Sequence, residues 1–172
     1  MRFAATHALS LNFLPAWLRS LEARTTVGPI QLVSDVAAHC EAQLQHGRVQ
    51  FLLCHGHERA PSGLDPASFV SCEVGRDELL PVCAPDAQGR PRFKLEAAPP
   101  RRGAKAALPM LAYSTESGLG RVLRSLHGAA LEAPGREVVF TAHLATVLRS
   151  LALEGRGLAF LPASLVREDL AA

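Results

Sequence analysis

The sequence predicts an α/β fold built from two successive strand–helix units. Two observations predict it. First, short apolar runs, typical of strands, alternate with stretches whose apolar residues recur every three or four positions, as in helices. Second, this alternation occurs twice, before and after a stretch at 61–85 that has no helical period. A chain of 172 residues can form one large domain or two small ones and bury a substantial core.

In the first half, strands are predicted over residues 2–6, 30–34 and 49–54. The nearly all-apolar stretch 49–54 is typical of a strand buried on both faces. Between the strands, a polar turn at 7–10 precedes the first helix, and Asp35 is placed to cap the second. Apolar residues at helical spacing define these two helices: Leu14, Trp17, Leu18 and Leu21, then Val36, Cys40 and Leu44.

The middle of the chain shows no helical period between residues 61 and 85. Extended segments at 69–74 and 78–83 are interpreted as crossover strands within about 69–85, so we expect a first subdomain over 1–80 and a second over 81–172. Residues 86–109 are rich in Pro, Gly, Ala and Arg, which predicts a flexible linker.

The second half repeats the strand–helix order. Strands are predicted over 111–114, 137–141 and 158–161, and Pro162 is placed to open a last short helix. The helices between these strands are indicated by two apolar stripes: Leu119, Val122, Leu123 and Leu126, then Leu144, Val147, Leu148 and Leu151.

Composition excludes several classes of protein. A net charge of +2 with no basic stripe argues against nucleic-acid binding by this chain alone. No signal peptide and no apolar run of about 18 residues is visible, so we expect a soluble, cytoplasmic chain without membrane contact. The four cysteines form no C-x-x-C pair, and His55 with His57 lacks a third ligand, so neither a metal nor a cofactor is predicted.

Polar and small residues follow the predicted strands where helices begin, which is the edge at which α/β sheets bind small molecules. The same hydroxyls can instead serve only as helix caps. No G-x-S-x-G elbow, Cys–His signature or G-x-G-x-x-G loop is present, so an enzyme is not predicted. The candidate effector-binding residues are Thr6, His7, Ser10, Ser34, His55, Ser114, Ser117, Gly118, Thr141 and His143.

Several stretches, in order along the chain, carry a resemblance to a known family. They are Leu14-Pro15, GRVQFLL at 47–53, DELLPV at 77–82 and GRGLAFLP at 155–162. The chain resembles the effector-binding domain of LysR-type transcriptional regulators along its whole length. SGLGR at 117–121 is most similar to the hypochlorite-responsive subgroup.

The resemblance implies two Rossmann-like subdomains with an effector cleft between them, similar to type 2 periplasmic binding proteins. It also implies a homo-oligomer, a dimer or tetramer, in which a small and possibly anionic effector or an oxidant changes the angle between the subdomains. DNA would be contacted only through a helix-turn-helix domain absent from this chain, and the first subdomain is expected to be incomplete at its C-terminus. If the signal is an oxidant, the candidate sulfur atoms are those of Met110, Cys54 and Cys83. A stand-alone solute-binding protein is the alternative.

Overall fold

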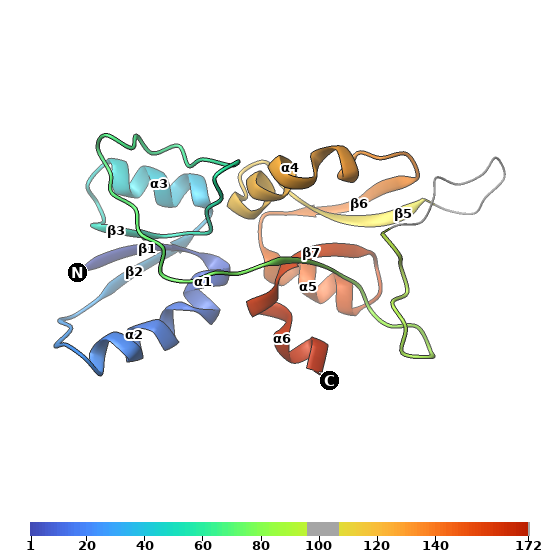
Figure 1. Cartoon of the computed structure of the whole chain (residues 1–172), viewed down its shortest axis with the longest axis horizontal. Coiled ribbons are helices and arrows are strands. Elements are labelled where there is room, and N and C mark those ends of the chain that lie inside the picture. Colours follow the sequence, from blue (N-terminus) through green and yellow to red (C-terminus); the bar gives the residue numbers. More distant parts are fainter. Residues whose placement is uncertain (96–106, 172) are drawn as a thin grey trace.

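The computed structural model describes residues 1–95 and 107–171 and has two α/β lobes side by side (Figure 1). The first lobe contains β1 (Arg2–Thr6), α1 (His7–Asn12), α2 (Leu14–Glu22), β2 (Gln31–Asp35), α3 (Ala37–Gln45) and β3 (Phe51–Leu53). The second contains β4 (Leu79–Val82), β5 (Leu108–Tyr113), α4 (Gly118–Leu131), β6 (Arg136–Ala142), α5 (Ala145–Leu153), β7 (Leu158–Pro162) and α6 (Ala163–Ala171).

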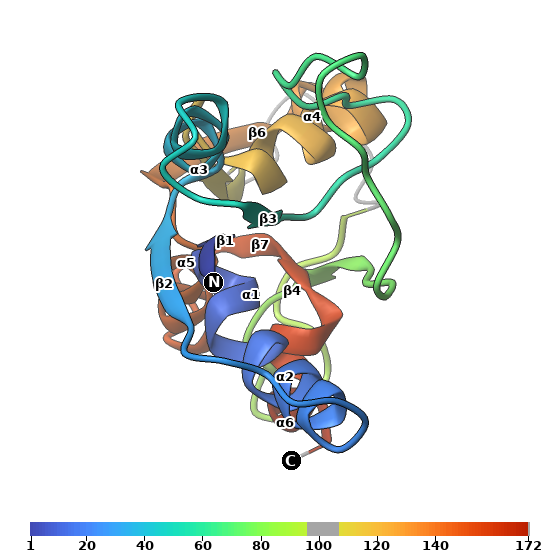
Figure 2. The same cartoon turned by 90° about the vertical axis from the view of Figure 1, so that its left-hand side faces the viewer.

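Each lobe has its own sheet covered by helices on both faces. The first sheet has the order β2-β1-β3 and is parallel, whereas the second has the order β4-β7-β5-β6 and is parallel except for β4, which runs antiparallel to β7. Figure 2 shows α3 on one side of the first sheet and α1 and α2 on the other. This confirms the predicted two-unit α/β fold.

The second lobe holds the larger core. Leu148 of α5 and Leu161 of β7 are fully buried there, among apolar residues of β5, α4 and α6. In the first lobe a smaller cluster joins Ala4, Cys40 and Val49. The hydrophobic contribution to folding free energy increases with the apolar area removed from water, so the larger core contributes more to the stability of the second lobe.

Three local predictions in the first lobe are wrong. Residues 7–10 are not a polar turn but the start of α1, which is followed directly by α2. Asp35 ends β2, and Val36 occupies the N-cap of α3 without a side-chain cap bond. β3 is short and lies at the edge of the sheet, where only β1 pairs with it among the described residues, so Phe51 is 47% exposed rather than buried.

The crossing between the lobes also differs from the prediction. Residues 69–74 form no strand, whereas β4 forms within the second extended segment and pairs with β7. Of the predicted linker, Phe93 packs against the core of the second lobe, and residues 96–106 lie outside the described residues. Pro162 ends β7 rather than opening α6. Across the described ranges, no helix combines the length and the apolar character that crossing a membrane requires.

We expect Leu148→Ala to lower the free energy of unfolding by about 3 kcal/mol, because it leaves a cavity in the core of the second lobe. Leu153→Ala is a matched control on the same helix, since Leu153 is 52% exposed. Urea denaturation measures both variants. Equal losses would contradict the placement of the core.

Candidate functional site

The two lobes touch where α1 of the first lies against α6 of the second and where α3 of the first approaches α4 of the second. A Cβ atom at Gly118 would lie 2.8 Å from the Cβ of Ala37, so only glycine permits this approach. One turn further along both helices, Nη2 of Arg121 donates a hydrogen bond to Oε1 of Glu41 at 2.7 Å. Glu41 is only 7% exposed, and its other carboxylate oxygen accepts a hydrogen bond from the backbone N–H of Gly63 at 3.3 Å. The lobes are therefore held together by a tight contact and a largely buried ion pair.

A small pocket lies between the lobes, and Ala37 and Gly118 form part of its wall. Its volume is about 30 Å³, the room taken up by roughly one or two water molecules. Both lobes contribute lining residues, which come from the carboxyl ends of strands and the first turns of helices: Thr6, His7, Ala8, Asp35, Val36, Ala37, His55, Ser117, Gly118, Leu119, His143, Leu144 and Ala145.

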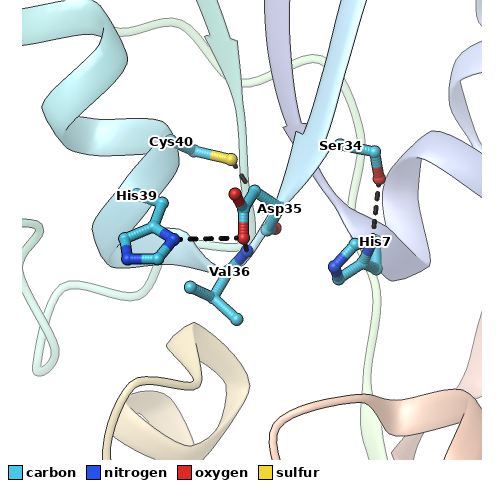
Figure 3. A network of polar contacts seen from close by, with 6 residues as sticks. All are labelled: His7, Ser34, Asp35, Val36, His39 and Cys40. Carbon is cyan, nitrogen blue, oxygen red and sulfur yellow. Dashed lines mark hydrogen bonds and ion pairs between the residues drawn. The ribbon is translucent and has the colours of Figure 1, made fainter.

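The imidazole of His7 is fixed by two serines. Oγ of Ser34 lies 2.9 Å from Nδ1 of His7 (Figure 3). Oγ of Ser10 donates to the carbonyl oxygen of His7 at 2.9 Å and lies 2.7 Å from Oγ of Ser34. Because each hydroxyl has one proton, the Ser34 hydroxyl donates to Ser10 and accepts from Nδ1–H of His7. In neutral His7 the proton is therefore on Nδ1, and Nε2 carries none.

Asp35 places a carboxylate beside His7, at the end of the neighbouring strand (Figure 3). Its Oδ1 accepts a hydrogen bond from the backbone N–H of Val36 at 2.7 Å and lies 3.3 Å from Nδ1 of His39. The hydrogen bond from Val36, and secondarily His39, lowers the pKa of Asp35 below its usual value. Asp35 therefore stays ionised at neutral pH.

His55 reaches the pocket from the segment after β3, and Asp77 lies behind it. Nε2 of His55 is 3.4 Å from Oδ2 of Asp77, and both side chains are largely shielded from solvent. The same carboxylate accepts hydrogen bonds from the hydroxyl of Ser164 at 2.5 Å, from the backbone N–H of Ser164 at 3.1 Å and from that of Glu78 at 2.9 Å. Burial alone would raise the pKa of Asp77, but the hydrogen bonds from His55, Ser164 and Glu78 together hold it well below the usual range.

The structure brings together part of the predicted site. The predicted residues that line the pocket are Thr6, His7, His55, Ser117, Gly118 and His143. Ser10 and Ser34 lie behind His7 as its supports, while Ser114 and Thr141 lie near the ends of β5 and β6 without lining the pocket.

Sequence reasoning interpreted Asp35 as a helix cap rather than a contact, because a carboxylate there would repel an anionic effector. It also did not select the apolar N-cap residues Val36 and Leu144, since nothing in their type distinguishes them from core residues. No three His, Cys, Asp or Glu side chains gather as a metal site within 1–95 and 107–171.

Of the candidate redox residues, Met110 is buried, whereas Cys54 and Cys83 are partly exposed. Met110 is 4% exposed in the core of the second lobe. Burial raises the pKa of the Cys54 thiol, and a neutral thiol reacts slowly. Sγ of Cys83 is engaged by Phe93, whose backbone N–H lies 3.4 Å away and whose carbonyl lies 3.7 Å away. By contrast, Cys72 is exposed.

Two α/β lobes around a pocket of strand ends and helix starts define a ligand-binding domain. The chain belongs to the family described as LysR substrate binding domain, which its residues 1–172 match. This confirms the resemblance stated from the sequence.

Two curated relatives come from Escherichia coli. The HTH-type transcriptional regulator YjiE of strain K12 is 26% identical over 170 residues, covering 99% of this chain and 51% of the relative. The HTH domain-truncated transcriptional regulator QseD of O157:H7 is 25% identical over 170 residues, covering 99% of this chain and 64% of that protein. The chain thus spans between half and two thirds of the length of these relatives.

Among solved structures, the regulatory domain of HypT from Salmonella typhimurium in its apo form has a similar fold. The TM-score is 0.75 with 24% sequence identity, and the match covers 99% of this chain and 74% of that one. At this level of identity the likeness is one of fold.

Removing Arg121 tests the contact between the lobes. We expect Arg121→Ala to lower the free energy of unfolding by about 3 kcal/mol, because it leaves the carboxylate of Glu41 buried without its partner charge. Arg76→Ala, which removes an exposed ion pair with Glu73, should leave stability unchanged. If both variants unfold at the same urea concentration as the wild type, the ion pair between the lobes does not contribute to the free energy of unfolding.

Thiol alkylation tests the accessibility of sulfur. We expect iodoacetamide to modify Cys72 first and Cys40 last, since Cys40 is 0% exposed and burial raises its pKa to about 11. Peptide mass mapping over time measures the order. Modification of Cys54 in the folded protein as fast as modification of Cys72 would instead favour a sulfur-based sensor.

Proposed function

We propose that this chain is the signal-sensing domain of a LysR-type transcriptional regulator and that its signal is a small anion bound between the lobes. One observation carries the proposal: the N-termini of α3 and α5, which belong to opposite lobes, open onto the same pocket. Their N-cap residues, Val36 and Leu144, make no side-chain cap bonds, and neither first turn contains an acidic residue. The first backbone N–H groups of both helices therefore remain for a ligand.

The size of the pocket favours an ion over a bulky metabolite. A volume of about 30 Å³ suits a halide or a small oxyanion better than a drug-sized ligand, which needs at least about 300 Å³. The HypT regulatory domain has also been solved with bromide bound, and the OxyR2 E204G regulatory domain from Vibrio vulnificus with sulfate. These structures have TM-scores of 0.75 and 0.73 to this chain, which supports choosing the same ions as probes.

Binding becomes a signal through the angle between the lobes. An anion that contacts α3 and α5 at once does so only when the lobes are close, so its differential affinity favours that arrangement. In the regulator, the resulting angle would be passed through the homo-oligomer to helix-turn-helix domains. We place the division between the lobes near residue 80, where the chain enters β4.

A thermal-shift titration with bromide and sulfate tests the anion site. We expect both ions to raise the melting temperature of the wild-type chain, because a ligand that binds only the folded state stabilises it. His143→Trp should remove this effect, since it fills the pocket from a position that is exposed and contributes little to the core.

The matched control is His46→Trp, because His46 is also an exposed histidine but lies at the far end of α3, outside the pocket. It should keep the full response to both ions. A response that survives in His143→Trp would place anion binding elsewhere on the chain.

Self-association is the second part of the proposal. The edge strands β2 and β6 expose apolar side chains, among them Val33 at 40%, Val138 at 58% and Val139 at 46%. Exposed edge strands with apolar side chains can pair with an edge strand of another molecule. We infer that the partner is a second copy of this chain.

We expect the wild-type chain to form dimers or larger oligomers and the double variant Val33→Lys/Val139→Lys to be a monomer. Sedimentation velocity over a hundredfold concentration range measures this. A wild-type chain that stays monomeric throughout would contradict self-association of this domain.

A further inference from the structure

A second and larger cavity lies between the lobes where α1 meets α6, on the side of the molecule away from α4 (Figure 1). Its volume is about 680 Å³, within the range of about 300–1,000 Å³ that is typical of small-molecule sites. It shares no lining residue with the smaller pocket. This cavity therefore has room for an organic ligand, which the smaller pocket lacks.

The first lobe gives the cavity an apolar, aromatic wall. Phe13 and Trp17 lie one helical turn apart, with ring centroids separated by 6.2 Å and ring planes inclined by 24°. Phe3, a buried residue of β1, supports Trp17 edge-on, with ring centroids 6.4 Å apart. The exposed side chain of Leu11 extends the same wall. An aromatic group that enters the cavity can therefore pack against rings that the core already holds in place.

The second lobe gives the cavity a polar wall that includes an unpaired cation. Arg149 of α5 donates two hydrogen bonds to Asp169 of α6, at 2.6 and 2.5 Å. These hydrogen bonds, together with the charges of Asp169 and Glu168, raise the pKa of Arg149, so both carboxylates lie near its guanidinium. Arg167 is exposed, lines the cavity and forms no ion pair with any residue that the structure describes. Its charge remains for a ligand.

Asn12, at the end of α1, contributes a further polar group to the lining. Its Nδ2 atom is buried and has no hydrogen-bond partner within residues 1–95 and 107–171. A buried donor without a partner costs free energy, and most such groups in folded proteins are paired. A ligand oxygen bound beside Asn12 would supply the missing acceptor.

We propose that this cavity is a second ligand site and that it takes an aromatic carboxylate. The ring of the ligand packs against Phe13 and Trp17, and its carboxylate pairs with Arg167. An apolar wall on one lobe and an unpaired cation on the other match the two ends of such a molecule. Because the ligand contacts both lobes at once, it favours the arrangement in which they are close. The site does not depend on the proposed anion site.

The fluorescence of Trp17 reports on this cavity, because Trp17 is the single tryptophan of the sequence. We expect phenylacetate to change the emission of the wild-type chain in a saturable way. Phenylacetamide has the same ring without the charge and should bind about tenfold more weakly, since its contact with Arg167 is no longer an ion pair. Equal affinities for the two compounds would overturn recognition of the carboxylate.

Removing the cation tests the assigned contact. Arg167→Gln should weaken phenylacetate binding by about tenfold and leave phenylacetamide binding nearly unchanged. Arg156→Gln is the matched control, because Arg156 is also exposed in the second lobe but lies outside the cavity. It changes the net charge equally and should bind phenylacetate as the wild type does. Equal losses in both variants would attribute the effect to net charge and overturn the role of Arg167.

A charge on the apolar wall tests the other end of the ligand. Leu11→Glu should weaken the binding of phenylacetate, because it places a carboxylate on the wall that the ring contacts. Leu153→Glu, at an exposed position of α5 outside the cavity, should have no effect. If Leu11→Glu binds phenylacetate as tightly as Leu153→Glu, the ring does not lie on this wall.

Isothermal titration calorimetry of His143→Trp, which fills the smaller pocket, separates the two sites. We expect its Kd for phenylacetate to equal that of the wild-type chain, since His143 does not line the larger cavity. Loss of phenylacetate binding in His143→Trp would place the compound in the smaller pocket and overturn the second site. If the wild-type chain does not bind phenylacetate by fluorescence or calorimetry, the second site is wrong and the proposed anion site is unaffected.

Discussion

The close approach of α3 to α4 joins the two lobes beside the pocket that lies between them. Gly118 and Ala37 approach so closely that a Cβ on Gly118 would lie 2.8 Å from that of Ala37, and both residues are also walls of the pocket. The ion pair of Glu41 with Arg121 holds the same two helices one turn further on. A change at this contact would therefore move the pocket walls as well as the lobes, since close-packed interfaces do not deform gradually.

The lobes differ in ways that suit a sensor. The second lobe has the larger core, in which Leu148 and Leu161 are fully buried. The first lobe has a smaller core and an edge strand on which Phe51 remains half exposed, although its ring stacks on Phe3 at 4.8 Å. A ligand that contacts both lobes shifts their arrangement by its differential affinity for the two arrangements, whatever the size of each core.

The sequence was sufficient to predict the alternating elements and the edge where they converge, because the apolar periods of β1, β5 and β7 and of the long helices depend on local pattern alone. It could not predict that β3 would be a short edge strand, because an apolar run such as VQFLLC is equally typical of a central strand. Of the residues that it proposed as effector contacts, His7, His55 and His143 line the pocket, and Asp35, which it did not propose, lines it too. Whether a residue after a strand caps a helix or faces a ligand depends on the other lobe, and local sequence carries no information about that neighbour.

The central claim is that a small anion binds between the N-termini of α3 and α5. Crystals of this chain soaked in bromide, with anomalous diffraction recorded at the bromine absorption edge, test it most directly. The account predicts an anomalous peak between the lobes, within hydrogen-bonding distance of the first backbone N–H groups of both helices and beside His55. Bromide peaks only on the outer surface, with the pocket closed by its own side chains, would contradict it.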